Sequence, residues 1–178
     1  MPTLHPVRLF LRAETAACHE RVDRAFSRFD LTDRGAYAAF LTAHARVLLP
    51  LEAVLDAAAL WPAWTGRGDL LRGDLATLGH VVPAGETVIA GGAAARWGML
   101  YVLEGSRLGG AMLARQVGPG LPAAYLAAAH RGGSWARFGD AIEQAGVAAE
   151  VRGDAGWRAD LLSGAERAFA LFEGAVRD

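Results

Sequence analysis

Apolar residues recur along most of the chain at intervals of three and four, the spacing that places them on one face of an α-helix. No alternating run of the kind expected for a half-buried strand extends beyond a few residues. The pattern predicts helices over residues 6–29, 34–59, 68–78, 93–117, 121–129, 135–145 and 156–176. We therefore expect an all-α fold, a compact helical bundle formed by a single domain over residues 1–178.

Breakers and capping residues define several of these ends. Pro50 lies inside the second predicted helix and is expected to kink it, while Thr32 or Asp33 can cap its start. Gly79 is the expected C-terminal cap of the third helix, because glycine adopts the left-handed conformation found there. Ser134 is the expected N-terminal cap of the sixth.

The helix over residues 93–117 carries an unusual set of glycines. Its segment YVLEGSRLGG, residues 101–110, contains Gly105, Gly109 and Gly110, and Gly98 lies two turns earlier on the same face. Each glycine in a helix interior costs about 1 kcal/mol relative to alanine. These four glycines, the glycine strip, leave a band of backbone without side chains. Either another helix or a flat ligand can lie against such a band, and the glycines alone leave both readings open.

Composition narrows the function classes. The chain has 18 basic and 19 acidic residues, so its net charge of -1 creates no overall field that favours nucleic acid or an anionic membrane. Cys18 is the only cysteine, which excludes an internal disulfide and suits a reducing compartment. The N-terminal apolar run is too short for a secretory signal, and no stretch approaches the roughly 20 apolar residues of a membrane span. We expect a soluble, cytoplasmic protein that neither crosses a membrane nor binds nucleic acid.

The histidines offer one kind of metal chemistry. The chain has 5 histidines but no HExxH, paired ExxH or Cys/His cluster, so its sequence does not favour a zinc or di-iron site. A GxSxG elbow and a P-loop are also absent from the sequence. A single histidine that acts as axial ligand to a metal-bearing cofactor remains compatible with it.

His19 is the best candidate for such a ligand. Arg12 precedes it by seven residues, or about 10 Å along a continuous helix. The iron and the propionate edge of heme are separated by a similar distance, so one helix could hold both. Spacing alone also fits, and by itself favours, a boundary histidine beside ordinary surface arginines.

Three stretches together resemble the heme oxygenase family, in particular its bacterial branch associated with bacteriophytochromes. They are LRAETAACHERVDRAF over residues 11–26, the region from Tyr37 to Pro50-Leu-Glu52, and YVLEGSRLGG over residues 101–110. The resemblance covers most of the chain and implies a heme oxygenase-like fold. It also implies that heme is both substrate and cofactor.

Site residues follow from this resemblance. It implies that His19 is the proximal iron ligand, with its other ring nitrogen bonded to an acceptor such as Glu20 or Glu52. It implies that Arg12 binds a heme propionate and that Tyr101 lies near the heme edge. It also implies that Gly105, Gly109 and Gly110 form the wall over the distal face. By rough position, Arg137 is the candidate for the second propionate partner.

Ser106 departs from the pattern of many family members, which carry an aspartate there that orders water. The phytochrome-associated branch resembles this chain at that position. A serine hydroxyl donates and accepts hydrogen bonds but holds no charge near neutral pH. Water ordered by backbone groups of the helix is therefore expected to carry the proton.

The activity implied is oxidative cleavage of heme to biliverdin, with release of CO and ferrous iron. The sequence has no flavin- or nucleotide-binding pattern, so electrons are expected from a separate reductase or ferredoxin, and a bacteriophytochrome is a possible recipient of biliverdin. One alternative is a carrier or sensor that binds heme or biliverdin without turnover. Another is a similar bundle that binds a different small molecule, or only a protein partner.

Overall fold

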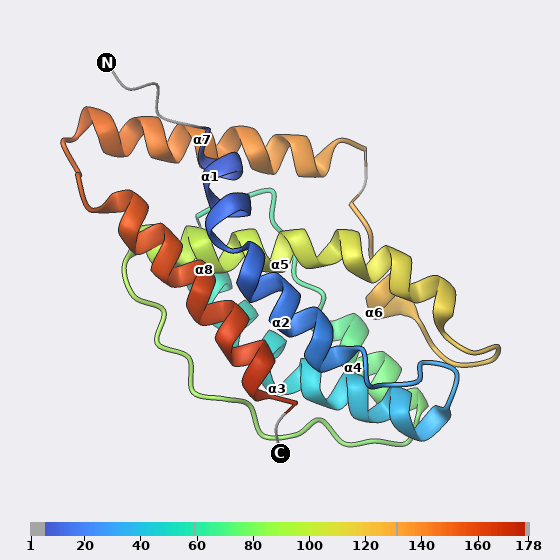
Figure 1. Cartoon of the computed structure of the whole chain (residues 1–178). Helices are drawn as coiled ribbons and strands as arrows, with labels where there is room; N and C mark the ends of the chain where they lie inside the picture. Colours follow the sequence, from blue (N-terminus) through green and yellow to red (C-terminus); the bar gives the residue numbers. More distant parts are fainter. Residues whose placement is uncertain (1–5, 59, 131, 177–178) are drawn as a thin grey trace.

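The computed structural model describes residues 6–58, 60–130 and 132–176, and every regular element within these ranges is helical. The expected all-α class is thereby confirmed. The elements, labelled in Figure 1, are α1 (Val7–Glu14), α2 (Ala16–Phe26), α3 (Arg34–Ala58), α4 (Gly68–Thr77), α5 (Ala93–Leu113), the 3₁₀ turn η1 (Ala114–Gln116), α6 (Ala124–Ala127), α7 (Ser134–Val151) and α8 (Trp157–Gly174).

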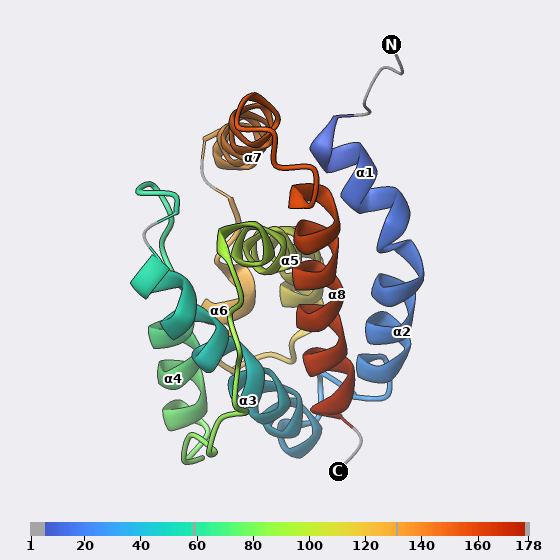
Figure 2. The same cartoon turned by 90° about the vertical axis from the view of Figure 1, so that its left-hand side faces the viewer.

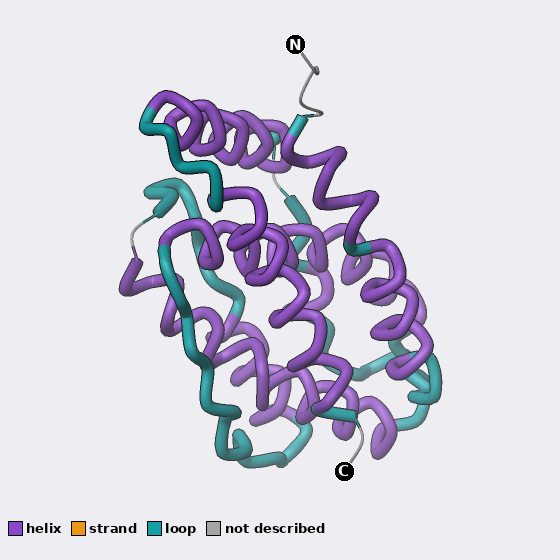
Figure 3. The backbone as a smooth tube through the Cα atoms, turned by 60° about the vertical axis from the view of Figure 1, so that its left-hand side comes forward, coloured by secondary structure: helices purple, strands orange, loops and turns teal. Residues whose placement is uncertain are grey.

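Helix α5 runs through the middle of the bundle and packs along α8 (Figures 1 and 2). Helix α2 also packs against α8, α3 contacts α4, α5 and α8, and α1 packs against α7. The long connection from α4 to α5 runs along the outside of the bundle (Figure 3). Helices α2 and α5, which carry His19 and the glycine strip, are therefore both positioned by α8.

The close contact between α5 and α8 depends on two glycines. A Cβ atom at Gly98 would lie 2.0 Å from the carbonyl oxygen of Leu161, and one at Gly164 would lie 2.0 Å from that of Ala95. No side chain fits at either position, because the atoms in the way belong to backbone. At Gly98, the glycine strip therefore allows close helix packing, which is one of the two interpretations given above.

The first predicted helix is interrupted at Thr15. Its φ of −98° and ψ of 5° end α1, and α2 begins at the next residue. The buried hydroxyl of Thr15 donates a hydrogen bond of 2.7 Å to the carbonyl of Leu11, a side-chain contact that bends helices. The prediction of one helix over residues 6–29 is therefore wrong. Arg12 belongs to the last turn of α1, whereas His19 belongs to α2.

Helix α3 agrees closely with its predicted range. Asp33 caps its start, since a side-chain oxygen accepts a 2.7 Å hydrogen bond from the amide of Ala36. Pro50 lies inside the helix and has no N–H to offer the carbonyl of Arg46. That carbonyl instead accepts a hydrogen bond of 2.8 Å from the amide of Glu86 in the outer connection.

Two shorter elements differ from their predicted extents. Helix α6 has only 4 residues, although the pattern predicted residues 121–129. Helix α7 begins as expected but continues to Val151, beyond the predicted end at 145. Gly133, with a φ of +73°, occupies its N-cap position in place of Ser134. The end of α4 is as predicted, with Gly79 at a φ of +80°.

One described helix is long and apolar enough to cross a membrane, which corrects the expectation that no stretch approaches this length. It covers Arg34–Leu55 of α3, and 56% of its apolar window is buried inside the bundle. Core helices of soluble proteins meet the same criterion of length and composition.

An aromatic cluster at α3 contains His44. Although part of this residue reaches the surface, its ring packs among those of Phe26, Phe40 and Phe172, with centroid distances of 4.4–5.5 Å. Its Nδ1 lies 2.8 Å from the hydroxyl oxygen of Tyr125. Burial, with a smaller contribution from the positive charge of Arg67, lowers the pKa of His44 to about 3. The imidazole is therefore neutral in the folded protein.

We expect this neutral histidine to make the protein sensitive to acid. Its pKa is near 6.5 when unfolded and about 3 when folded, so the unfolded state binds the proton more readily. Stability is then full above pH 6.5 and falls as the pH drops from 6.5 towards 3, by up to about 5 kcal/mol. Urea unfolding at pH 7 and at pH 5 measures the loss. The variant His44→Phe should show a flatter pH dependence, and an equally steep one would assign the sensitivity to other groups.

Candidate heme-binding site

His19 presents one free ring nitrogen. Its side chain is 64% exposed on α2, and its Nδ1 lies 3.0 Å from a carboxylate oxygen of Asp23, one turn further along. A carboxylate oxygen can only accept, so Nδ1 carries the hydrogen and Nε2 keeps its lone pair. The edge of the ring meets Phe169 of α8 at a centroid distance of 6.1 Å. The arrangement fits an iron ligand, whose second nitrogen is held by a carboxylate in many metal sites.

Asp23 was missed in the sequence, where Glu20 and Glu52 were the proposed acceptors. Glu20 is exposed, and the carboxylate of Glu52 instead accepts hydrogen bonds of 2.6 and 2.7 Å from the amides of Arg67 and Gly68. It caps the start of α4. The signal for Asp23 was its spacing of four residues from His19, which places both side chains on one face of a helix.

Gly105 and Gly109 leave the surface of α5 open. A Cβ atom at either would meet no atom within 4 Å outside the helix itself. Beside them, Leu108 and Met112 are 48% and 68% exposed. Bare backbone next to exposed apolar side chains is a surface suited to a flat apolar ligand. The remaining glycine of the segment, Gly110, instead packs on α6, where a Cβ would lie 3.1 Å from the carbonyl oxygen of Leu126.

A positively charged group of residues surrounds Tyr101 of α5. Burial raises the pKa of its hydroxyl, and the charges of Arg12 and Arg8 on α1 partly offset this rise, so both guanidinium groups lie within electrostatic reach. The guanidinium of Arg8 lies where a Cβ at Gly139 of α7 would come within 2.5 Å of it. Its Nε is buried and has no hydrogen-bond partner. Two arginines and a phenol suit the binding of carboxylates, such as those of heme propionates.

Arg12 and Tyr101, both expected from the resemblance, thus interact electrostatically, and Arg8 adds a second charge. Their roles toward heme stay predictions. The spacing of four residues between Arg8 and Arg12 was the available signal. Arg137 lies at the start of α7, where its guanidinium donates a 2.7 Å hydrogen bond to the carbonyl of Gly132. Its role as second propionate partner stays a prediction.

Ser106 is held by groups of the protein. Its hydroxyl donates a hydrogen bond of 2.7 Å to the carbonyl of Leu103 and accepts one of 2.6 Å from Nη2 of Arg67. Only its second lone pair remains for water. Most of the hydrogen-bonding capacity of this hydroxyl is therefore used by the protein, and little remains to bind the water that is expected to deliver protons.

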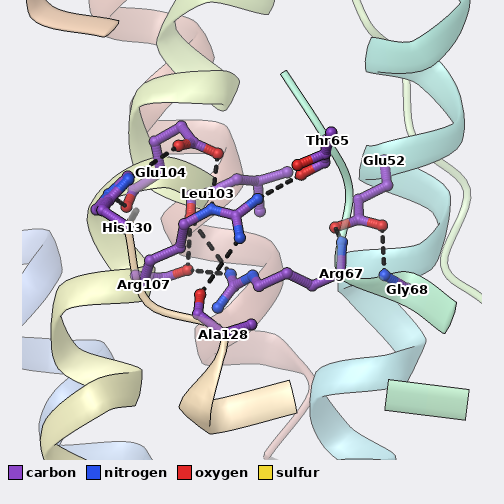
Figure 4. Close-up of polar contacts among 10 residues, drawn as sticks. Glu52, Thr65, Arg67, Gly68, Leu103, Glu104, Arg107, Ala128 and His130 are labelled. Atoms are coloured by element: carbon purple, nitrogen blue, oxygen red, sulfur yellow. Dashed lines mark hydrogen bonds and ion pairs between the residues drawn. The ribbon is translucent and has the colours of Figure 1, made fainter. Parts of the chain in front are cut away.

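A buried polar cluster is centred on Arg107, the residue that follows Ser106 (Figure 4). Arg107 donates to Glu104 at 2.9 Å, to the carbonyl of Ala128 at 3.3 Å and to that of Thr65. His130 contributes both ring nitrogens: Nε2 lies 2.9 Å from the carbonyl oxygen of Glu104, and Nδ1 lies 3.5 Å from a carboxylate oxygen of the same residue. No local signal in the sequence identified this cluster, because its members come from three separate segments.

The described part of the chain contains no group of three or more His, Cys, Asp or Glu side chains that could hold a metal ion together. No multi-ligand metal site among these residues is therefore an alternative to His19. A single histidine, open glycine backbone, exposed apolar side chains and paired arginines are the groups that heme requires. The residues present therefore fit heme.

Known proteins give an independent view of the same chain. No family model matches it. A curated heme oxygenase from Xanthomonas campestris pv. campestris is 37% identical over 151 residues, which cover 79% of this chain and 88% of the relative. The crystal structure of the NO- and CO-bound heme oxygenase from Neisseria meningitidis matches with a TM-score of 0.81 and 24% identity, over 97% of this chain and 91% of that one. The structural match shows the same fold, and the identity and coverage of the Xanthomonas relative show that the chain belongs to the heme oxygenase family.

Proposed function

We propose that the protein cleaves heme oxidatively to biliverdin, CO and ferrous iron, using O₂ and external electrons. Family membership supports the reaction. The observation in the structure that carries it is the exposed imidazole of His19, with Nδ1 occupied by Asp23 and Nε2 free to bind iron. Heme, as substrate, supplies the iron that activates O₂.

Each part of the protein has a distinct task in this proposal. His19 holds the iron from α2, with Asp23 fixing its ring. Arg12, Arg8 and Tyr101 bind the propionates and so fix the rotation of the heme in its plane. Gly105 and Gly109 would let heme lie close to the backbone of α5, which would restrict where O₂ can react and would exclude bulk water.

The partners of the reaction are also proposals. Members of the family need a reductant, so we infer a separate reductase or ferredoxin as electron donor. We propose a bacteriophytochrome as recipient of biliverdin, on the resemblance of the sequence to that branch. A cytoplasmic location is supported by the single cysteine, Cys18, which is buried and unpaired.

Turnover of added heme tests the function directly. We expect the purified protein to bind hemin with a shifted Soret band. Given O₂ and a reductant, it should replace that band with the absorption of biliverdin and release CO. A stable Soret band under these conditions would favour the carrier or sensor alternative, and no shift on binding would contradict both.

Hemin titration of variants tests the propionate site. We expect Arg12→Gln or Arg8→Gln to weaken binding by about 10-fold, since each removes a charge-assisted hydrogen bond to a carboxylate. Arg137→Gln is the matched comparison from α7. Losses in Arg12→Gln and Arg137→Gln, with wild-type binding by Arg8→Gln, would show that the second propionate partner is Arg137 instead of Arg8. Wild-type binding by both Arg12→Gln and Arg8→Gln would contradict the propionate site on α1.

A further inference from the structure

The stretch of α5 that is proposed to lie against heme has few side chains that could fix its position. Gly105 and Gly109 leave one side of the helix bare, and glycines weaken a helix by about 1 kcal/mol each. We call residues 105–110 the glycine segment. Contacts from other elements must therefore fix its position.

Arg67 makes such contacts from outside α5. The residue is 2% exposed and lies in the connection just before α4. Its Nη2 donates to the hydroxyl of Ser106 at 2.6 Å and to the carbonyl of Leu103 at 3.3 Å. Its other terminal nitrogen, Nη1, lies 3.8 Å from the place where a Cβ of Gly110 would be. One guanidinium thus reaches the beginning and the end of the glycine segment.

Arg67 is itself firmly positioned. Its amide donates to Glu52 of α3 at 2.6 Å, and its guanidinium carbon lies 4.9 Å from the ring centroid of Tyr125 in a cation–π contact. Burial raises the pKa of Glu52, while its hydrogen bonds to the amides and the charges of Arg67 and Arg107 act in the opposite direction. Through these contacts α3 and α6 fix the arginine. The arginine in turn contacts Leu103 of α5 (Figure 4).

Two carbonyls just before the glycine segment accept hydrogen bonds from side chains in addition to those of the helix. In a helix each carbonyl accepts from the amide four residues later. The carbonyl of Leu103 also accepts from Arg67 and Ser106, and that of Glu104 also accepts from His130. These extra bonds set the direction of the backbone while the side with Gly105 and Gly109 stays free.

We propose that Arg67 is a positioning residue that fixes the glycine segment through Ser106 and Leu103, and thereby determines which meso carbon of heme is oxidised. The proposal rests on the proposed function. If the backbone of α5 limits the directions open to bound O₂, a looser segment permits attack at more than one carbon.

Hydrogen exchange of the protein without heme tests the clamp by itself. The variant Arg67→Met removes the charged donor but keeps much of its length. We expect amide exchange of residues 107–110 to accelerate by about 10- to 100-fold, the effect of losing hydrogen bonds from a charged group. Arg34→Met is the matched control, because Arg34 also donates to a main-chain carbonyl, that of Leu78, away from α5. Equal exchange in wild type and Arg67→Met would overturn the proposal.

The ratio of biliverdin isomers, measured by chromatography, tests the consequence. We expect one main isomer from the wild type and Arg34→Met, a mixture from Arg67→Met, and partial recovery of the main isomer in Arg67→Lys. An unchanged ratio in a variant that still turns over would overturn the specificity role, whereas absence of biliverdin from the wild type would refute the proposed function alone.

Folding of the variants does not limit the test. If Arg67→Met fails to fold, Ser106→Ala removes the 2.6 Å contact while leaving the buried arginine and its other partners in place. We expect the same changes with smaller size. Unaltered exchange and isomer ratio in Ser106→Ala and Arg67→Lys would then overturn the proposal.

Discussion

Replacing His19 with alanine is expected to lower heme turnover by at least about 10²-fold and to leave the fold unchanged. Loss of the outer partner of a metal-bound histidine alone costs about 10- to 100-fold, so loss of the ligand costs at least as much. The side chain is 64% exposed, and such substitutions change stability by no more than about 0.5 kcal/mol. The absorption spectrum with hemin, the rate of biliverdin formation and thermal unfolding measure these effects.

Two further variants make this result specific. Asp23→Asn keeps the ligand but weakens the acceptor on Nδ1, so we expect an intermediate loss of about 10-fold. His80→Ala removes another exposed histidine, in the connection after α4, and should behave as wild type. A His19→Ala protein with the wild-type heme spectrum would show that the ligand assignment is wrong.

The second large effect separates the two roles of the glycine strip. At Gly98, alanine places its Cβ 2.0 Å from the backbone of α8, so the two helices must move apart. We expect a loss of about 3 kcal/mol or more, or a melting temperature roughly 6–12 °C lower. At Gly105, alanine meets nothing within 4 Å and gains helix propensity, so stability should rise by about 1 kcal/mol.

Turnover should change in the opposite sense to stability at Gly105. The added methyl group occupies the open side of α5, and a misplacement of about 1 Å at a reacting centre can cost 10²-fold in rate. Gly73→Ala is the control, since this glycine of α4 also has nothing within 4 Å and should gain stability without loss of turnover. If Gly105→Ala turns over heme at the wild-type rate, the open face of α5 does not contact the substrate.

Elements marked by a local sequence pattern were predicted correctly, whereas those that depend on contacts with the rest of the bundle were not. Helices α3, α5 and α8 have long apolar periodicity with clear breakers at their ends, and the predicted ranges agree closely. The break at Thr15 has no such marker, because threonine also occurs inside helices and the bend depends on its burial against the rest of the bundle. The short extent of α6 likewise depends on contacts that no local pattern records.

The site shows the same division. The sequence predicted His19, Arg12 and Tyr101, which belong to two recognisable motifs that the structure distributes over three helices. Arg67 lies 39 positions before Ser106, and only the packing of α4 on α6 and of α6 on α5 brings their side chains together. A motif describes one stretch of chain, so it cannot report a contact between stretches.

Because of the break at Thr15, α1 and α2 can change position independently during evolution. Helix α1, with Arg8 and Arg12, packs on α7, whereas α2, with His19, packs on α8. In the proposed site, the propionates and the iron of heme would therefore be bound by different helices, α1 and α2. Sequence drift or an engineered loop that repositions α1 on α7 would rotate heme in its plane and leave the iron ligand in place. The fold can thus acquire a new product isomer without first rebuilding its metal site.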